Sequence, residues 1–200
     1  MRKIAHIVSW VLSPLLIPSY GMVMALWLTG LGVFPVWVRV RITAVVWVLT
    51  CVLPMLAIFA LWCLRVVTSF GLNNRKERPI PYLLTVACYL ATAGYLYAIH
   101  APQWLWLFMV AGAGAAVVSF IVNFWWKISA HMAAAAGLLA MAFRIASDKL
   151  AVIDMWPVMT VAILLLGLLG TCRMVLKCHT LGQVLAGTAN GFLWVYLLTI

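Results

Sequence analysis

Carboxylate side chains are nearly absent from this chain. Only three occur in 200 residues: Glu77, Asp148 and Asp154. Magnesium and calcium prefer hard oxygen ligands, usually with two or more carboxylates converging on the ion. The shortage therefore argues against a metal-dependent lipid phosphotransferase. The five cysteines show no paired CxxC spacing, so the sequence gives no sign of a disulfide-stapled ectodomain.

Charge of either sign is also scarce. Charged residues make up 8% of the chain, hydrophobic residues make up 68%, and the mean hydropathy is +1.16. Soluble domains are about half apolar and a quarter charged, so the composition indicates an integral membrane protein of one domain. The net charge of +10 would suggest nucleic acid in a soluble chain. Here the basic residues flank apolar runs, where they meet lipid phosphates, so we exclude nucleic acid and expect membrane lipids as partners.

Apolar runs recur along the whole chain. A helix needs about 20 apolar residues to cross the bilayer core. The pattern predicts an all-α polytopic transmembrane bundle of six to seven membrane segments. The expected segments are residues 4–31, 42–64, 82–99, 104–122, 132–146, 155–171 and 181–200. Pro14 and Pro18 fall in the first run, so we expect a kink there or an interfacial beginning.

Three polar clusters interrupt the apolar pattern. They are residues 75–79, residues 127–131, and Arg173 with His179. The clusters follow the second, fourth and sixth segments, so two crossings separate each from the next. All three are therefore expected at one membrane face, with Asp148 and Asp154 at the other. Charged groups beside a bilayer core are costly, which makes them candidates for function.

The spacing within the clusters favours an anion site. A regular helix turns by about 600° between Arg173 and His179, so the chain must bend for both side chains to reach one target. Gln183 follows His179 by four residues and shares its helical face. Its amide oxygen can then accept a hydrogen bond from Nδ1 of His179, which leaves Nε2 unprotonated. Ser129 and His131 precede an apolar run, so we expect them at a helix N-terminus, which attracts anions.

The cations in the clusters have two interpretations. Arg75, Lys76 and Arg78 alone suggest a juxtamembrane anchor for anionic lipid. Lys127 alone suggests a snorkelling side chain, and His131 or His179 alone fits an interfacial residue as well as a catalytic one. Taken together, two histidines and several cations at one face, with almost no carboxylate to neutralise them, predict a phosphate-binding site.

These residues resemble the three motifs of the type 2 phosphatidic acid phosphatase superfamily. The family motifs are Lys, six residues, Arg-Pro; then Pro-Ser-Gly-His; then Ser-Arg, five residues, His, three residues, Asp. The matching residues are Arg78 and Pro79, then Ser129 and His131, then Arg173 and His179. Other motif positions differ and carry Gly71, Ile128, Ala130, Cys172 and Gln183.

The resemblance implies a mechanism without a cofactor. His179 would attack phosphorus and form a phosphohistidine, and His131 would protonate the leaving group. Gln183 stands where the family has the aspartate that orients the nucleophile. The residues expected to bind the substrate phosphate are Arg75, Lys76, Arg78, Lys127, Ser129 and Arg173. We therefore expect a metal-independent phosphatase that acts on a membrane lipid phosphate or diphosphate.

Candidate substrates are undecaprenyl diphosphate, phosphatidylglycerol phosphate, phosphatidic acid and a lipid A phosphate. They suggest the cytoplasmic membrane of a bacterium, with the face of the site and the oligomeric state left open. One alternative is a phosphotransferase that passes the phosphate to another lipid. The other is a non-catalytic protein that binds anionic lipid through a degenerate site, with Gln183 as the mark of lost activity.

Overall fold

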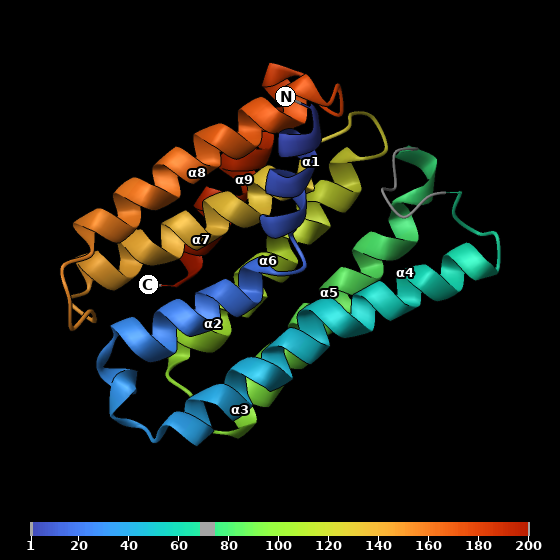
Figure 1. The fold of residues 1–200 in the computed structure, drawn as a ribbon. Helices are drawn as coiled ribbons and strands as arrows, with labels where there is room; N and C mark the ends of the chain where they lie inside the picture. Colours follow the sequence, from blue (N-terminus) through green and yellow to red (C-terminus); the bar gives the residue numbers. More distant parts are fainter. Residues whose placement is uncertain (1, 69–74, 200) are drawn as a thin grey trace.

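The structure, a computed structural model, describes residues 2–68 and 75–199 and is built from helices (Figure 1). Within these ranges the one β pairing is an isolated bridge between Thr29 and Ala151. The elements are α1 (Arg2–Val11), α2 (Ile17–Leu28), η1 (Gly30–Val33), α3 (Val36–Trp47), η2 (Val48–Val52), α4 (Leu53–Cys63), η3 (Arg75–Glu77), α5 (Pro79–Ala98), α6 (Gln103–Val122), α7 (Ala130–Ser147), α8 (Trp156–Val175) and α9 (Leu181–Leu198).

Within the described residues, six helices are long and apolar enough to cross a membrane. Five of them are α5 to α9. The sixth is the continuous helix Val36–Cys63, which α3, η2 and α4 form together. The arrangement confirms the expected all-α polytopic bundle of six to seven segments.

The first expected segment is broken into two helices. α1 ends at Val11 and α2 begins at Ile17. Pro14 lacks the N–H that would continue a helical ladder, whereas Pro18 stands in the first turn of α2, where proline is tolerated. The 12 residues of α2 extend only about 18 Å, less than a bilayer core. α1 packs against α8 near one end of the bundle (Figure 1).

The second segment begins earlier than expected, at Val36 rather than residue 42. The prediction took Arg39 and Arg41 as the edge of the membrane segment, but both lie within α3. The guanidinium of Arg39 lies 4.9 Å from the ring centroid of Trp27, and that of Arg41 lies 5.6 Å from the ring centroid of Trp37. These cation–π contacts stabilise charge beside an apolar surface, so the helix continues through both arginines.

α9 packs its backbone directly against the beginning of α7. A Cβ atom at Gly191 would overlap the carbonyl oxygen of Ala133, and one at Gly187 would lie 2.5 Å from that of Ser129. Small residues at such interfaces let membrane helices approach closely. The contact brings the N-terminal turn of α9 beside the N-terminal turn of α7.

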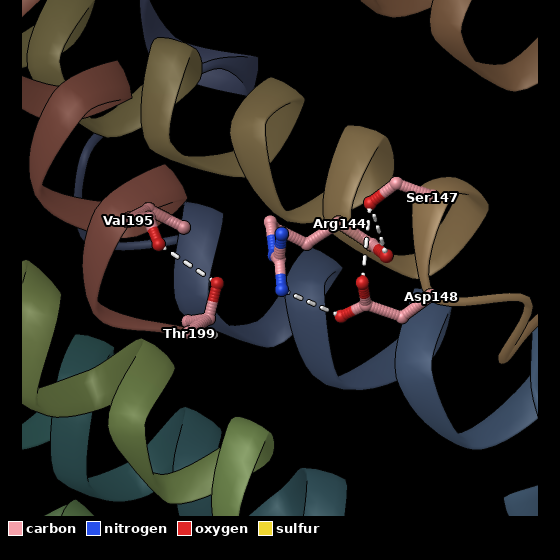
Figure 2. Close-up of polar contacts among 5 residues, drawn as sticks. All are labelled: Arg144, Ser147, Asp148, Val195 and Thr199. Carbon is pink, nitrogen blue, oxygen red and sulfur yellow. Dashed lines mark hydrogen bonds and ion pairs between the residues drawn. The ribbon is translucent and has the colours of Figure 1, made fainter.

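The far end of α7 carries an ion pair, which Figure 2 shows. Arg144 donates a hydrogen bond of 2.8 Å to Asp148, and its guanidinium lies 5.5 Å from the ring centroid of Tyr196. Nearby, the hydroxyl of Thr199 donates to the carbonyl of Val195. Because α7 has 18 residues and extends about 27 Å, Asp148 lies far from the helix start. This agrees with the expected separation of Asp148 from the polar clusters.

Candidate functional site

The three polar clusters meet at one end of the bundle. The connections from α6 to α7 and from α8 to α9 lie together at the upper end in Figure 1. The amide of Asn123 donates to the carbonyl of Arg75 at 3.0 Å, which joins the first cluster to the end of α6. The backbone N–H of Ser129 donates to the carbonyl of Gln183 at 3.3 Å, which joins the second cluster to α9. The structure thus brings together segments more than 100 residues apart.

The chain bends between Arg173 and His179, as the spacing predicted. Arg173 lies in the last turn of α8, which ends at Val175, and His179 precedes α9. Lys177 has a φ of 55°, a left-handed conformation that commonly follows a helix C-terminus. The turn reverses the chain, so both side chains face the same region.

His179 is buried, with 7% of its surface exposed, and its ring is held at one nitrogen. Nδ1 lies 3.2 Å from Oε1 of Gln183 and 3.3 Å from the carbonyl oxygen of Lys127. Both partners are acceptors, so Nδ1 carries the proton and donates. Nε2 is then the basic nitrogen of the neutral ring. The Gln183 contact was expected from the spacing, whereas no pattern indicated the carbonyl of Lys127, 52 residues away.

Gln183 also caps α9. Its Oε1 accepts from the backbone N–H of Thr180 at 3.2 Å, and the Thr180 side chain accepts from the backbone of Gln183, forming a capping box. Two N–H donors therefore fix the amide oxygen toward the loop. The Thr-x-x-Gln pattern at 180–183 is the sequence signal for this second role, and the sequence interpretation missed it.

His131 lies at the beginning of α7, as expected. Ser129 is the N-cap position with extended backbone, and Ala130 is the first helical residue. The ring of His131 makes a hydrogen bond with the backbone of Ser9 in α1. Ser9 was not among the predicted site residues, because only the tertiary packing of α1 against α8 brings it to the beginning of α7.

Three buried polar atoms around the histidines lack a hydrogen-bond partner among the described residues. They are the hydroxyls of Ser9 and Ser129 and Nε of Arg173. Ser9 is 6% exposed and Ser129 is fully buried. Buried polar atoms are rarely left unpaired, since each costs free energy. Their grouping beside His131 is consistent with a bound polar ligand.

Positive charge converges on the two histidines. Arg78 is buried, donates to the phenol oxygen of Tyr82, and lies within electrostatic range of Lys127, Arg173 and both histidines. Burial, followed by the charges of Arg173, Arg78 and Lys127, lowers the pKa of His179 to about 4. The hydrogen bond that Nδ1 of His179 donates to Gln183 opposes this shift only in part. At neutral pH His179 is therefore uncharged and lies in a positive field.

The pKa of Lys127 is lowered by burial and by the neighbouring charge of Arg78. Mutual repulsion of this kind is relieved when an anion binds. The site is therefore electrostatically prepared for a phosphate or another compact anion.

The remaining residues of the first cluster lie at the edge of the site. Arg75 donates to the carbonyl of Trp125 at 2.6 Å, and Lys76 is exposed. Glu77 accepts hydrogen bonds from the backbone N–H and the hydroxyl of Thr68, both at 2.9 Å. Phosphate binding by Arg75 and Lys76 stays a prediction. Gly71, at the position of the family lysine, lies outside the described residues.

Comparison with known proteins gives no match: no family model matches the chain, and no curated protein or solved structure matches it significantly. Any function proposed for the site must therefore be argued from its residues and geometry.

Proposed function

We propose that the protein is a metal-independent phosphatase that removes phosphate from a membrane lipid phosphate or diphosphate. The observation that carries the proposal is the state of His179. Its Nδ1 proton is held by the Lys127 carbonyl and Gln183, so Nε2 is unprotonated and has a free lone pair, and the charges of Arg173, Arg78 and Lys127 act on the ring. A neutral imidazole in a positive field is suited to attack the phosphorus of a bound phosphate.

The reaction would proceed in two displacements. In the first, Nε2 of His179 forms a bond to phosphorus while the bond from phosphorus to the lipid oxygen breaks. His131, which takes up a proton when the bound phosphate anion offsets the surrounding positive charge, gives that proton to the departing oxygen. In the second, His131 takes a proton from water, whose oxygen attacks the phosphohistidine. The phosphorus–nitrogen bond breaks, and inorganic phosphate and free His179 result.

The surrounding residues would hold the transferring group. Arg78 and Arg173 supply fixed positive charge, and Lys127 adds a third cation. The hydroxyl of Ser129 and Nε of Arg173 are buried donors without a partner among the described residues. Donors that are already oriented stabilise charge that develops on the phosphoryl oxygens in the transition state.

A second candidate function is binding of anionic lipid without catalysis. It is favoured by the capping box, because Gln183 has a structural use that does not depend on chemistry. A neutral amide can also select the tautomer of His179 but cannot stabilise positive charge on the ring as a carboxylate would. A phosphotransferase would differ only in the acceptor of the phosphoryl group.

The test is phosphate release by the purified protein in EDTA, with phosphatidic acid and undecaprenyl diphosphate as substrates. We expect His179→Ala to abolish release and His131→Ala to lower kcat by about a hundredfold or more. His100→Asn is the matched control. His100 is exposed between α5 and α6 with a φ of 56°, which asparagine tolerates, and this variant should keep wild-type activity.

Two results would decide against the mechanism. Phosphate release that survives His179→Ala would exclude a phosphohistidine at this residue. A wild-type protein that releases no phosphate from either lipid but binds vesicles containing phosphatidic acid would favour the binding protein. Both substrates are consistent with a bacterial cytoplasmic membrane, which we propose as the location.

A further inference from the structure

An apolar groove begins below the candidate site and extends into the membrane-spanning part of the bundle. It lies between α7, α8 and the chain from the end of α1 to α2, and its lining is apolar throughout. Its volume is about 180 Å³. Pockets that enclose a whole small ligand occupy roughly 300–1,000 Å³. The groove is therefore the size of part of one chain, not of a two-chain lipid.

The α7 wall lies on the same helical face as His131. Ala135, Leu138 and Ala142 line the groove and follow His131 by four, seven and eleven residues. Residues at these separations form one stripe along an α-helix. From His131 to Ala142 the stripe extends about 16 Å, roughly half of the 30 Å hydrocarbon core.

The other two walls also begin at the site. On α8, Leu166 and Ala162 line the groove and precede Arg173 by seven and eleven residues, so they share its face. In the N-terminal segment, Leu12 lines the groove three residues after Ser9, whose backbone bonds to His131. Each of the three segments therefore carries one residue of the candidate site and, farther toward the middle of the bundle, a residue that lines the groove.

We propose that this groove holds one hydrocarbon chain of the lipid phosphate whose headgroup occupies the site, and that Ala135, Ala142 and Ala162 set the chain length accepted. The inference rests on the proposed function, and it names the substrate as a lipid recognised through a single chain. The side chains of these alanines are small, so they leave the groove open between two helices. The surrounding lipid tails are as apolar as the groove, so the chain gains little hydrophobic free energy by entering it. The groove instead packs around the chain and thereby positions the phosphorus of the headgroup at the site.

The enzymatic test compares Ala162→Phe with Ile163→Phe. Ala162 lies halfway along the groove, whereas Ile163 is the next residue on α8 and is 49% exposed on the outer surface. The measurement is kcat/KM for phosphatidic acids with long and with short acyl chains, in detergent. We expect Ala162→Phe to lower the long-to-short ratio about tenfold or more. Ile163→Phe should keep the wild-type ratio, and equal ratios for both variants would overturn the proposal.

A second measurement needs no turnover and applies even if Ala162→Phe fails to fold. The wild-type protein is irradiated with a phosphatidic acid that carries a photoreactive group at the end of one acyl chain. Crosslinks to Leu138, Ala142 or Val158 are expected, and they should be competed by unlabelled phosphatidic acid. A diacylglycerol probe with the same chain should crosslink there weakly, because it lacks the headgroup that anchors the chain at the site.

Equal labelling by the two probes would mean that the groove holds any membrane lipid, and it would overturn the proposal. Labelling confined to outer residues such as Ile163 would do the same. Failure of the proposed function would give a different result. Crosslinks in the groove that require the phosphate headgroup of the probe, in a protein that releases no phosphate, would support the chain site in a binding protein.

Discussion

The protonation of His179 decides when its Nε2 can act as a nucleophile. Burial and the neighbouring cations lower its pKa to about 4. A group with a lowered pKa stays neutral until the pH falls through that lower value, so we expect the histidine-dependent acid limb of kcat/KM near pH 4. An unperturbed histidine would lose half of its nucleophile near pH 6.5. The measurement is the pH profile of phosphate release between about pH 3.5 and 8. This range includes both the lowered pKa of His179 and the ordinary pKa of histidine.

Gln183→Glu is the control for this prediction. Glutamate has the length of glutamine, so the capping box with Thr180 can persist. Its carboxylate beside Nδ1 stabilises imidazolium, which raises the pKa of His179 toward its ordinary value. The acid limb should therefore move to higher pH. A phosphate monoester itself titrates near pH 6, which affects the profiles of both proteins equally. The difference between the wild-type and Gln183→Glu profiles on one substrate therefore reports the titration of His179. Coincident profiles would contradict the assignment.

The helix contact that carries the site depends on two glycines of α9. A Cβ at Gly191 would overlap the carbonyl of Ala133, so Gly191→Ala must separate α9 from α7. Overpacking of this kind costs about 1–3 kcal/mol, and we expect a lower midpoint of thermal unfolding in detergent. Gly167→Ala on α8 is the matched control. A Cβ there meets no atom within 4 Å, so alanine should stabilise the helix by about 0.5–1 kcal/mol. Equal destabilisation by both variants would show that the close approach is not required.

Some elements were predictable because their signals are local. Period, length and hydropathy identified the long helices, and the four-residue spacing predicted the contact between His179 and Gln183. The start of α3 was misplaced because arginine normally ends a membrane segment, whereas Arg39 is stabilised here by the ring of Trp27. That compensation comes from another helix and leaves no trace in the local pattern.

The tertiary parts of the site could not be predicted. Ser9 reaches His131 only because the break before α2 lets α1 pack against α8 beside the beginning of α7. The carbonyl of Lys127 accepts from His179 only because α9 packs tightly on α7. A backbone carbonyl has no residue-type signature, so no motif search would have found it.

The whole molecule makes a topological prediction that is independent of catalysis. Two membrane-spanning helices separate the α6–α7 connection from the α8–α9 connection, and one separates either from the α7–α8 connection. Trp125 and Lys177 must therefore face one side of the membrane and Lys149 the other. All three are exposed.

The test is labelling of single cysteines at these three positions, in a variant whose five native cysteines are replaced by alanine. The reagent is a membrane-impermeant maleimide, applied to sealed vesicles of both orientations. Trp125→Cys and Lys177→Cys should react in the same vesicles and Lys149→Cys in the opposite ones. Reaction of Trp125→Cys and Lys177→Cys in opposite vesicles would contradict this topology, because the second and third polar clusters would then have no common membrane face. Reaction of all three from one side would mean that α7 and α8 do not both span.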